Sequence, residues 1–489
     1  MNMVNATTQA ECGGSPAAVV ILAAGQGTRM KSAKPKVLHE ICGRSLLGFA
    51  IEAAKELSPK QIEVVVRHDR DAVAAHALEL YPDAVIADQD EIPGTGRAAQ
   101  CAMAALDANG EISGPVLITC SDVPLLDGAT LAELLANHQQ SGASLTLLTT
   151  VLADPSGYGR VVRDAQGDVT AIVEQKDATD GQRKINEVNA GIYVVDAAVL
   201  RAALKSLQPS LVTGEVYLTD IVDYAVKQGL PAKAVIAADN YSVEGCNDRA
   251  TLAALGAEMN RRIVERWMYE GVTVVDPATT WIDVQVQLAP DVTIEPGVQL
   301  RGNTKVAPGA IVGPDSTLVN VTIGEGASVV RTHGTDAVIG AGAEVGPFTY
   351  LRPGTVLGAH GKIGAYCETK NAQIGDNSKV PHLSYVGDAE IGVGTNIGAA
   401  TIFANYDGVH KHPTKVGDHV RVGSDSILVA PVNIGDGAYT AAGSVITQDV
   451  PAGALGVGRA HQHVSEGWTA KRRAGTASAE AAAAANQSK

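Results

Sequence analysis

An aliphatic residue recurs at every sixth position through the C-terminal part of the chain, from Leu288 to Ile446. The repeat pauses and resumes several times, and Thr440 keeps its register at one position. An α-helix repeats every 3.6 residues and a strand every two, so this period predicts a parallel β-helix, in which each flat face points one aliphatic side chain inward. The aliphatic positions are Leu288, Ile294, Leu300, Val306, Val312, Leu318, Ile339, Val345, Leu351, Leu357, Ile363, Ile374, Val380, Val386, Ile391, Ile397, Val416, Val422, Leu428, Ile434 and Ile446.

Three faces make one coil of about 18 residues, so the repeat predicts roughly eight or nine coils. At a strand spacing of ~4.8 Å these coils stack to about 40 Å. Nothing before residue 270 shares the period. The chain therefore contains a second, different domain.

Residues 18–247 alternate between apolar runs and helical patterns. Residues 18–24 form a continuous apolar run that ends in glycine, and residues 64–66, 84–86 and 116–118 predict further strands. Helical patterns lie between them, for example at 46–57 and 97–105. Such alternation predicts a Rossmann-like, doubly wound α/β sheet.

The remaining segments have simpler patterns. Residues 1–17 predict a flexible leader, and they lack the basic and apolar regions of a signal peptide. Residues 248–270 predict an amphipathic linker helix, and the β-helix domain follows over residues 271–460. Residues 461–489 form an Ala-rich tail that we expect to be partly disordered.

Composition excludes several classes of protein. The net charge of −15 argues against a protein that coats nucleic acid. The six cysteines form no Cys-x-x-Cys pair, so neither a zinc site nor a disulfide framework is indicated, and reduced thiols in a cytoplasmic protein are expected. No apolar stretch approaches the ~20 residues of a membrane span.

The first predicted strand runs into a glycine-rich loop with basic residues. Gly25 and Gly27 allow backbone N–H groups to approach a polyphosphate, and the start of a helix beyond them would add a favourable dipole. Arg29, Lys34 and Lys36 supply positive charge. These residues alone leave open a solvated basic turn.

Asp122 follows a predicted buried strand, where open α/β sheets bind ligands. A carboxylate there suits Mg²⁺, which favours one or two carboxylates together with phosphate oxygens. A helix N-cap is the alternative.

The β-helix carries polar residues that its walls do not need. Arg352, Glu368 and Lys370 lie about one coil from His382, so stacking of the coils can bring them together. Cations can hold a sugar phosphate, and a histidine can accept the proton that an amine loses on acetylation. The repeat also breaks at residues 403–415, which predicts a loop excluded from the stack.

The motif Leu-Ala-Ala-Gly-x-Gly-Thr-Arg-Met…Pro-Lys resembles that of sugar-1-phosphate nucleotidyltransferases. Residues 18–460 resemble the bifunctional N-acetylglucosamine-1-phosphate uridylyltransferase and glucosamine-1-phosphate N-acetyltransferase family. The resemblance implies that the β-helix is left-handed and built of hexapeptide repeats. It implies acetyl transfer from acetyl-CoA, then uridylyl transfer from UTP, in the synthesis of UDP-N-acetylglucosamine for the bacterial cell wall. It also implies a homotrimer with sites between subunits.

The resemblance assigns roles in the N-terminal domain. Lys36 would bind phosphates, Gln89, Gly94 and Thr95 would contact uracil and ribose, and Asp122 and Asn247 would hold Mg²⁺. Cys120 and Ser121 stand where the family usually has an aromatic residue and a glycine. The implied positions for UTP and the UDP-sugar are Leu22, Ala23, Ala24, Gly25, Lys36, Gln89, Gly94, Thr95, Cys120, Ser121, Asp122, Gly159, Glu174, Asn189 and Asn247.

In the C-terminal domain the resemblance implies that His382 is the general base and that Glu368 orients its imidazole. Arg352 and Lys370 would bind the phosphate of glucosamine 1-phosphate. The implied sugar contacts are Tyr385 and Asn396, and the implied acetyl-CoA contacts are Ala399, Asn405, Tyr406, Ser424, Ala442 and Arg459. Two alternatives remain: a single-activity nucleotidyltransferase with a structural trimerisation module, and a binding protein with decayed sites.

Overall fold

The computed structural model describes residues 14–210 and 214–487. Most of the predicted leader, with Cys12, lies outside these residues. Pro16 and Ala17, which were assigned to the leader, are buried, and the Ala17 N–H donates to the Pro115 carbonyl (2.7 Å). The described residues divide into two compact units: 14–210 and 214–270 with Trp281–Val286, and Gly271–Thr280 with 287–487.

The first unit is built on a mixed sheet. Strand β1 (Ala18–Leu22) pairs in parallel with β4 (Ile62–Val66) and β6 (Pro115–Cys120), so its carboxyl end lies between theirs. The full order is β11 (Ala232–Ile236), β7 (Leu145–Val151), β10 (Glu187–Asp196), β6, β1, β4 and β5 (Val85–Asp88). Strand β10 is antiparallel to β6 and β7, and the hairpin β8 (Arg160–Arg163) and β9 (Val169–Val173) branches from it.

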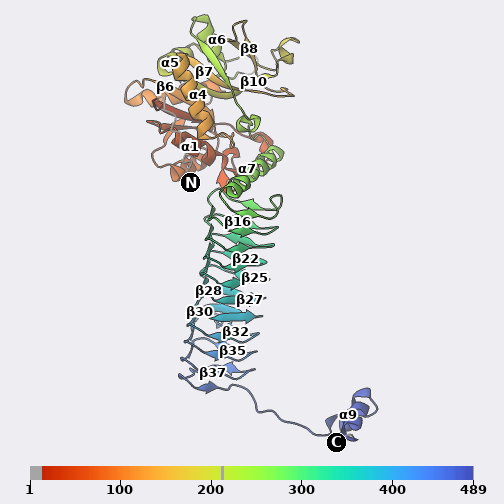
Figure 1. Cartoon of the computed structure of the whole chain (residues 1–489). Helices are drawn as coiled ribbons and strands as arrows, with labels where there is room; N and C mark the ends of the chain where they lie inside the picture. The colour runs from red at the N-terminus through yellow and green to blue at the C-terminus, as the bar shows by residue number, and fades with distance from the viewer. Residues whose placement is uncertain (1–13, 211–213, 488–489) are drawn as a thin grey trace, which may run out of the picture. The chain divides into compact units, whose positions relative to one another are not determined.

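Helices cover both faces of this sheet (Figure 1). Helices α3 (Thr95–Leu106), α5 (Ala197–Ser206) and α6 (Asp220–Lys227) pack their apolar residues on one face. Helices α1 (Leu46–Glu56), α2 (Arg70–Leu80) and α4 (Gly128–Ser141) pack on the other. The predicted doubly wound α/β fold is therefore confirmed, with β10 as an antiparallel insertion. Helix α7 (Arg249–Tyr269) forms where the linker helix was predicted.

One buried carboxylate interrupts this apolar core. Glu63 on β4 is fully buried on the face covered by α3, and neither carboxylate oxygen has a hydrogen-bond partner among the described residues. Burial raises the pKa of Glu63 to about 8 from its ordinary 4.5. The folded chain therefore keeps a proton that the unfolded chain releases.

We expect Glu63→Gln to stabilise the protein at pH 8 and much less at pH 5. Between the unfolded and folded pKa values the folded state binds more protons, so the free energy of unfolding of the wild type falls as pH rises, by at most about 1.4 kcal/mol per pH unit. Glutamine cannot ionise, so the difference in melting temperature between variant and wild type should widen from pH 5 to pH 8. Glu133→Gln, on the exposed surface of α4, is the control. A difference that does not change with pH would contradict the prediction.

The second unit is a β-helix (Figure 1). Its strands are two to seven residues long and pair in parallel with the next coil, as in Leu288↔Val306 and Ile294↔Val312. Every aliphatic position of the predicted repeat is buried, and so is Thr440. The fold is therefore a left-handed parallel β-helix of hexapeptide repeats, as predicted.

The coils are not all of one length. Pairs are 18 residues apart at Leu300↔Leu318 and 16 apart at Leu318↔Gly334, where the sixth-residue repeat pauses. The largest step is 25 residues, at Ile391↔Val416, because a loop leaves the stack there. This loop is shorter than predicted: Phe403 lies in β32 (Ile402–Ala404) as a buried core residue, and Lys415 lies in β33 (Thr414–Val416).

The tail contains two helices, α8 (Trp468–Arg472) and α9 (Ala477–Gln487), in the segment for which partial disorder is predicted. Neither helix has a buried residue, and the Arg473 guanidinium lies 5.0 Å from the centroid of the Trp468 ring. None of the helices described is long and apolar enough to cross a membrane.

Candidate functional site

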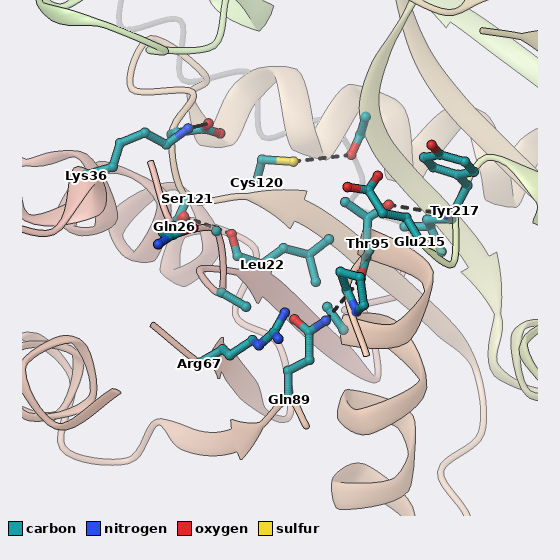
Figure 2. A pocket seen from close by; sticks show the side chains of 18 of the residues that line it. Leu22, Gln26, Lys36, Arg67, Gln89, Thr95, Cys120, Ser121, Glu215 and Tyr217 are labelled. Carbon is teal, nitrogen blue, oxygen red and sulfur yellow. Dashed lines mark hydrogen bonds and ion pairs between the residues drawn. The ribbon is translucent and has the colours of Figure 1, made fainter. Parts of the chain in front are cut away.

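A cavity of about 830 Å³ opens at the carboxyl ends of β1, β4, β5 and β6 (Figure 2). Most of the residues predicted for the nucleotide and sugar line it. They are Leu22, Ala24, Gly25, Lys36, Gln89, Gly94, Thr95, Cys120, Ser121, Asp122, Glu174 and Asn189. Ala23 is instead buried in the core behind the loop, and Gly159 and Asn247 lie outside the lining.

The glycine-rich loop folds tightly against the segment that carries Lys36. Gly27 has a φ of 64°, and a Cβ there would lie 2.5 Å from the Cβ of Lys36. A larger residue would therefore push the lysine away. The predicted helix beyond the loop is only the 3₁₀ turn Thr28–Met30, so the expected helix dipole is small. Positive charge at the loop comes mainly from side chains.

Lys36 and Asp122 form an ion pair on this cavity, and both side chains are mostly buried. The Cys246 N–H donates to the backbone carbonyl of Asp122 (2.7 Å), which brings the neighbouring Asn247 toward the same place. The Asn247 Oδ1 accepts a hydrogen bond from Arg29 Nη2 (2.7 Å). The Asp122 carboxylate and the Asn247 amide oxygen are thus positioned near each other, and each is paired with a cation.

The alternative role of Asp122 as a helix N-cap is wrong. Helix α4 is capped by Asp127, whose side chain accepts from the Thr130 N–H (2.8 Å). Asp122 is therefore left to face the cavity.

The sugar side of the cavity carries Glu174 and Asn189. Burial, and then the charges of Asp177 and Asp220, raise the pKa of Glu174. The Asn189 Nδ2 donates to the Tyr193 hydroxyl (2.7 Å), which fixes the orientation of its amide. These groups can exchange hydrogen bonds with sugar hydroxyls.

Cys120 and Ser121 occupy the two unusual positions without straining the backbone. The Ser121 hydroxyl donates to the Leu22 carbonyl (2.8 Å) and so ties β6 to β1 at the edge of the cavity. The Cys120 thiol lies 3.8 Å from the Gly191 carbonyl, and burial raises its pKa to about 12. Cys120 is thus a neutral, unreactive wall residue.

Several residues of the lining were not predicted. The segment from Glu215 to Thr219 lies across the start of α3: the Gly96 N–H donates to the Val216 carbonyl (2.8 Å), and the Leu218 N–H donates to the Thr95 hydroxyl (3.2 Å). Arg67 follows β4 directly, so the rule that ligands bind beyond the carboxyl ends of strands would have indicated it. Arg29, predicted to supply positive charge at the glycine-rich loop, also lines the cavity. The unpredicted lining residues include Gln26, Arg67, His68, Glu215, Tyr217, Leu218 and Thr219.

In the β-helix, the predicted phosphate-binding cations lie close together. The register Tyr350↔Glu368↔Tyr385 stacks three coils, and Arg352 Nη1 donates to Glu368 Oε1 (2.9 Å). The pKa of Lys370 is lowered mainly by its contact with Lys411, a residue of the excluded loop that was not predicted. Together the cations form a site that suits a phosphate dianion.

The excluded loop is anchored next to these cations. The Asn405 amide donates to Asp388 Oδ2 (2.5 Å) and approaches the Tyr385 hydroxyl (3.5 Å). The Tyr406 hydroxyl donates to the Gly408 carbonyl (2.6 Å) within the loop. Asn396 lies on another face, in register with Lys379.

His382 ends strand β29 (Lys379–His382) at an edge of the prism, and its side chain is exposed. Its carbonyl accepts from the Ala400 N–H (3.1 Å) of the next coil. Glu368 makes its hydrogen bond with Arg352, and neither its carboxylate nor any other side chain in the described ranges hydrogen-bonds the imidazole. The orienting role of Glu368 thus stays a prediction.

Three residues predicted to bind acetyl-CoA lie in line with His382 on the coils that follow it. This column consists of His382, Ala399, Ser424 and Ala442. The Asp425 N–H donates to the Ala399 carbonyl (2.7 Å), and the Gly443 N–H donates to the Ser424 carbonyl (2.8 Å). Ala399, Ser424 and Ala442 therefore occupy equivalent places in successive coils. Arg459 lies beside Gly443 at the lower end.

Comparison with known families agrees with this architecture. Residues 19–185 match the MobA-like NTP transferase domain family, and residues 413–448 match the bacterial transferase hexapeptide family (six repeats). The fold and these matches define a two-domain transferase, in which a nucleotidyltransferase domain precedes a hexapeptide-repeat domain.

Close relatives identify the family. The bifunctional protein GlmU of Pseudarthrobacter chlorophenolicus is 58% identical over 470 residues, which cover 96% of each chain. That of Kineococcus radiotolerans is 58% identical over 471 residues (96% of this chain, 95% of the relative), and that of Corynebacterium efficiens is 55% identical over 478 (97% and 98%).

The chain belongs to this family of bifunctional N-acetylglucosamine-1-phosphate uridylyltransferases and glucosamine-1-phosphate N-acetyltransferases. The prediction of one enzyme with both activities is confirmed. The alternative, a single-activity nucleotidyltransferase with a purely structural repeat domain, is not supported.

Proposed function

We propose that the N-terminal cavity binds UTP and N-acetylglucosamine 1-phosphate, and that the β-helix edge at His382 acetylates glucosamine 1-phosphate. The observation that supports the first site best is the convergence of Lys36, Asp122 and the glycine loop on one cavity at the switch point of the sheet. The second is supported best by the column that runs from His382 through Ala399, Ser424 and Ala442.

In the first site, Leu22, Ala24 and Gly25 would hold the nucleotide through their backbone, and the buried Ala23 would support the loop from behind. Gln89, Gly94 and Thr95 would bind the uracil and ribose. The sugar would lie against Glu174 and Asn189, with Gly159 behind Glu174, where a Cβ would be 3.3 Å from its carboxylate. Cys120 and Ser121 would shape the wall between the two substrates.

Asp122 and Asn247 would hold Mg²⁺. The donor set fits this ion, because a carboxylate and an amide oxygen are hard ligands, and the Cys246–Asp122 hydrogen bond keeps them near each other. When bound, the ion would neutralise charge on the phosphates. Lys36 and Arg29, which now pair with these oxygens, would turn toward phosphate oxygens instead.

The reaction there needs no general base. An oxygen of the sugar phosphate attacks the α-phosphorus of UTP, and its bond forms as the bond to pyrophosphate breaks. This phosphate is already ionised at pH 7. The residues contribute by aligning the two substrates and by placing the Lys36 ammonium near the developing charge.

In the second site, Arg352, Lys370 and the unpredicted Lys411 would bind the phosphate, with Tyr385 and Asn396 on the sugar. The amine attacks the thioester carbonyl, the C–N bond forms as the C–S bond breaks, and the amine proton passes to His382. Coenzyme A leaves as the thiolate, which takes up this proton from the His382 imidazolium and so becomes the free thiol. The acetyl-CoA would lie along Ala399, Asn405, Tyr406, Ser424 and Ala442, with Arg459 on its phosphates.

We propose that the chain forms a homotrimer through the edge that carries His382. Three apolar side chains in successive coils along this edge are largely exposed: Phe348 (52%), Tyr366 (61%) and Leu383 (58%). Phe348 and Tyr366 stack with their ring centroids 5.2 Å apart. A ladder of exposed apolar groups beside a flat site is typical of a surface that another subunit covers. That subunit would also complete the pocket for acetyl-CoA.

A coupled assay tests the whole proposal. The purified chain, first confirmed by light scattering to have about three times the chain mass of 50.3 kDa, is supplied with acetyl-CoA, glucosamine 1-phosphate, UTP and Mg²⁺. Free thiol should be released first and pyrophosphate after it, because the acetylated product is the substrate of the second site. Pyrophosphate without thiol would refute the acetyl half. We also propose a cytoplasmic location, because UTP and acetyl-CoA are cytoplasmic metabolites; cell fractionation tests it.

A further inference from the structure

We propose that Arg67 reads the nucleobase together with Gln89, as a second specificity residue of the uridylyl site. This inference rests on the proposed binding of UTP in the N-terminal cavity.

Gln89 presents a fixed hydrogen-bond acceptor to the cavity. Its side-chain Nε2 donates to two backbone carbonyls, those of Ile92 (2.8 Å) and Gly94 (3.2 Å). A flipped amide would place Oε1 against both carbonyls, so the orientation is determined. Both amide hydrogens are thus used, and the structure gives Oε1 no hydrogen bond within the described ranges. Gln89 can therefore only accept from a ligand.

Arg67 presents donors next to this acceptor. Val66 and Asp88 are register partners on β4 and β5, and the Gln89 N–H donates to the Val66 carbonyl (2.9 Å), so Arg67 and Gln89 are neighbours beyond the two strand ends. Figure 2 shows the Arg67 guanidinium pointing toward the Gln89 amide, and both residues line the cavity.

The Arg67 side chain is held in place but not saturated. Its Nη2 donates to the Glu91 carbonyl (2.8 Å), while the Glu91 carboxylate is 4.0 Å away and fully exposed. The other guanidinium nitrogens have no hydrogen bond in the part of the chain that the structure describes. A guanidinium has five N–H donors and no acceptor, so several donors remain for a ligand.

This acceptor–donor pair matches uracil in one pose. The uracil N3–H donates to Gln89 Oε1, and the neighbouring O4 carbonyl of uracil accepts from Arg67. In the same pose cytosine presents its bare N3 to the Gln89 oxygen, and its 4-amino group is a donor. Cytosine would then leave buried polar groups unpaired, which is the condition under which a hydrogen-bonding site discriminates most strongly.

The test compares Arg67→Met with wild type, using UTP and CTP. Methionine keeps an extended side chain and removes the donors. We expect kcat/KM for UTP to fall about 10–100-fold, and the UTP/CTP preference to fall with it, because the lost donors contact a carbonyl that uracil has and cytosine lacks. Calorimetric Kd values for UDP and CDP should show the same loss of preference without any turnover. Arg67→Lys, which keeps the charge but not the planar fork, should recover only part of the preference.

Arg70→Met is the matched control. It removes the same charge three residues further on, where Arg70 pairs with exposed Asp88 outside the cavity lining, and it should keep the wild-type UTP/CTP ratio. Equal losses for UTP and CTP in Arg67→Met would mean a phosphate contact and overturn the proposal. Unchanged kinetics would mean a purely structural role and would overturn it too. Failure of the wild type to release pyrophosphate from UTP would instead refute the proposed function itself.

Discussion

Replacing His382 with alanine should lower the rate of acetyl transfer by about 10²–10⁴-fold, the usual contribution of a general base, and leave uridylyl transfer at the wild-type rate. The imidazole is exposed at the edge of the prism, directly above the column proposed for acetyl-CoA. Acetylation of an amine requires that its proton leave as the C–N bond forms, and among the residues that the structure describes no other histidine lies on this column. The loss should appear in kcat with little change in the KM for glucosamine 1-phosphate, because the phosphate is held by other residues.

The control for this variant is His360→Ala. His360 is another exposed histidine at a corner of the β-helix, near Gly342, outside the proposed sites. It should retain both activities. Free thiol and pyrophosphate are measured separately for each variant. Acetyl transfer at the wild-type kcat in His382→Ala, or a loss of pyrophosphate release from added N-acetylglucosamine 1-phosphate and UTP, would contradict two independent sites.

The β-helix core could be predicted from the sequence because its interior accepts one side chain per face. The six-residue repeat did not predict the interior positions that a residue other than an aliphatic one occupies. Gly334 pairs with Leu318 and Leu351 in a shortened coil, and Thr369 occupies the interior with its hydroxyl 2.9 Å from that of Thr355. Phe403 fills an interior position just before the excluded loop. Pairing between coils, rather than a strict period, decides which residues lie inside.

The residues of the candidate sites also fall into two groups, those that the sequence could predict and those that it could not. Residues directly after a strand, such as Asp122, could be predicted from the position of the strand ends. Lys411 and Tyr217 could not, because their contacts depend on how a loop folds back onto a distant strand or helix. Asn247 is an intermediate case: family resemblance indicated it, and the hydrogen bond from Cys246 to Asp122 explains its place.

Replacing Asp122 with asparagine should lower uridylyl transfer by about 10²–10³-fold, as loss of a preorganised electrostatic contact does, and spare acetyl transfer. Asparagine keeps the shape but removes the charge that both Lys36 and a bound divalent ion require. The Mg²⁺ concentration for half-maximal pyrophosphate release should therefore rise, a change that a merely structural role would not produce.

The same substitution also leaves the Lys36 ammonium without its partner in the ligand-free protein. Its side chain is only 13% exposed, so we expect a cost of about 1–3 kcal/mol in the free energy of unfolding. UTP should offset part of this cost by giving the ammonium a phosphate partner, so melting curves with and without nucleotide measure it. Asp127→Asn is the matched control, because asparagine still caps α4 and Asp127 lies outside the cavity lining. If Asp127→Asn lost as much uridylyl transfer as Asp122→Asn, or if the Mg²⁺ dependence were the same in Asp122→Asn and wild type, Asp122 would not be the metal-binding carboxylate.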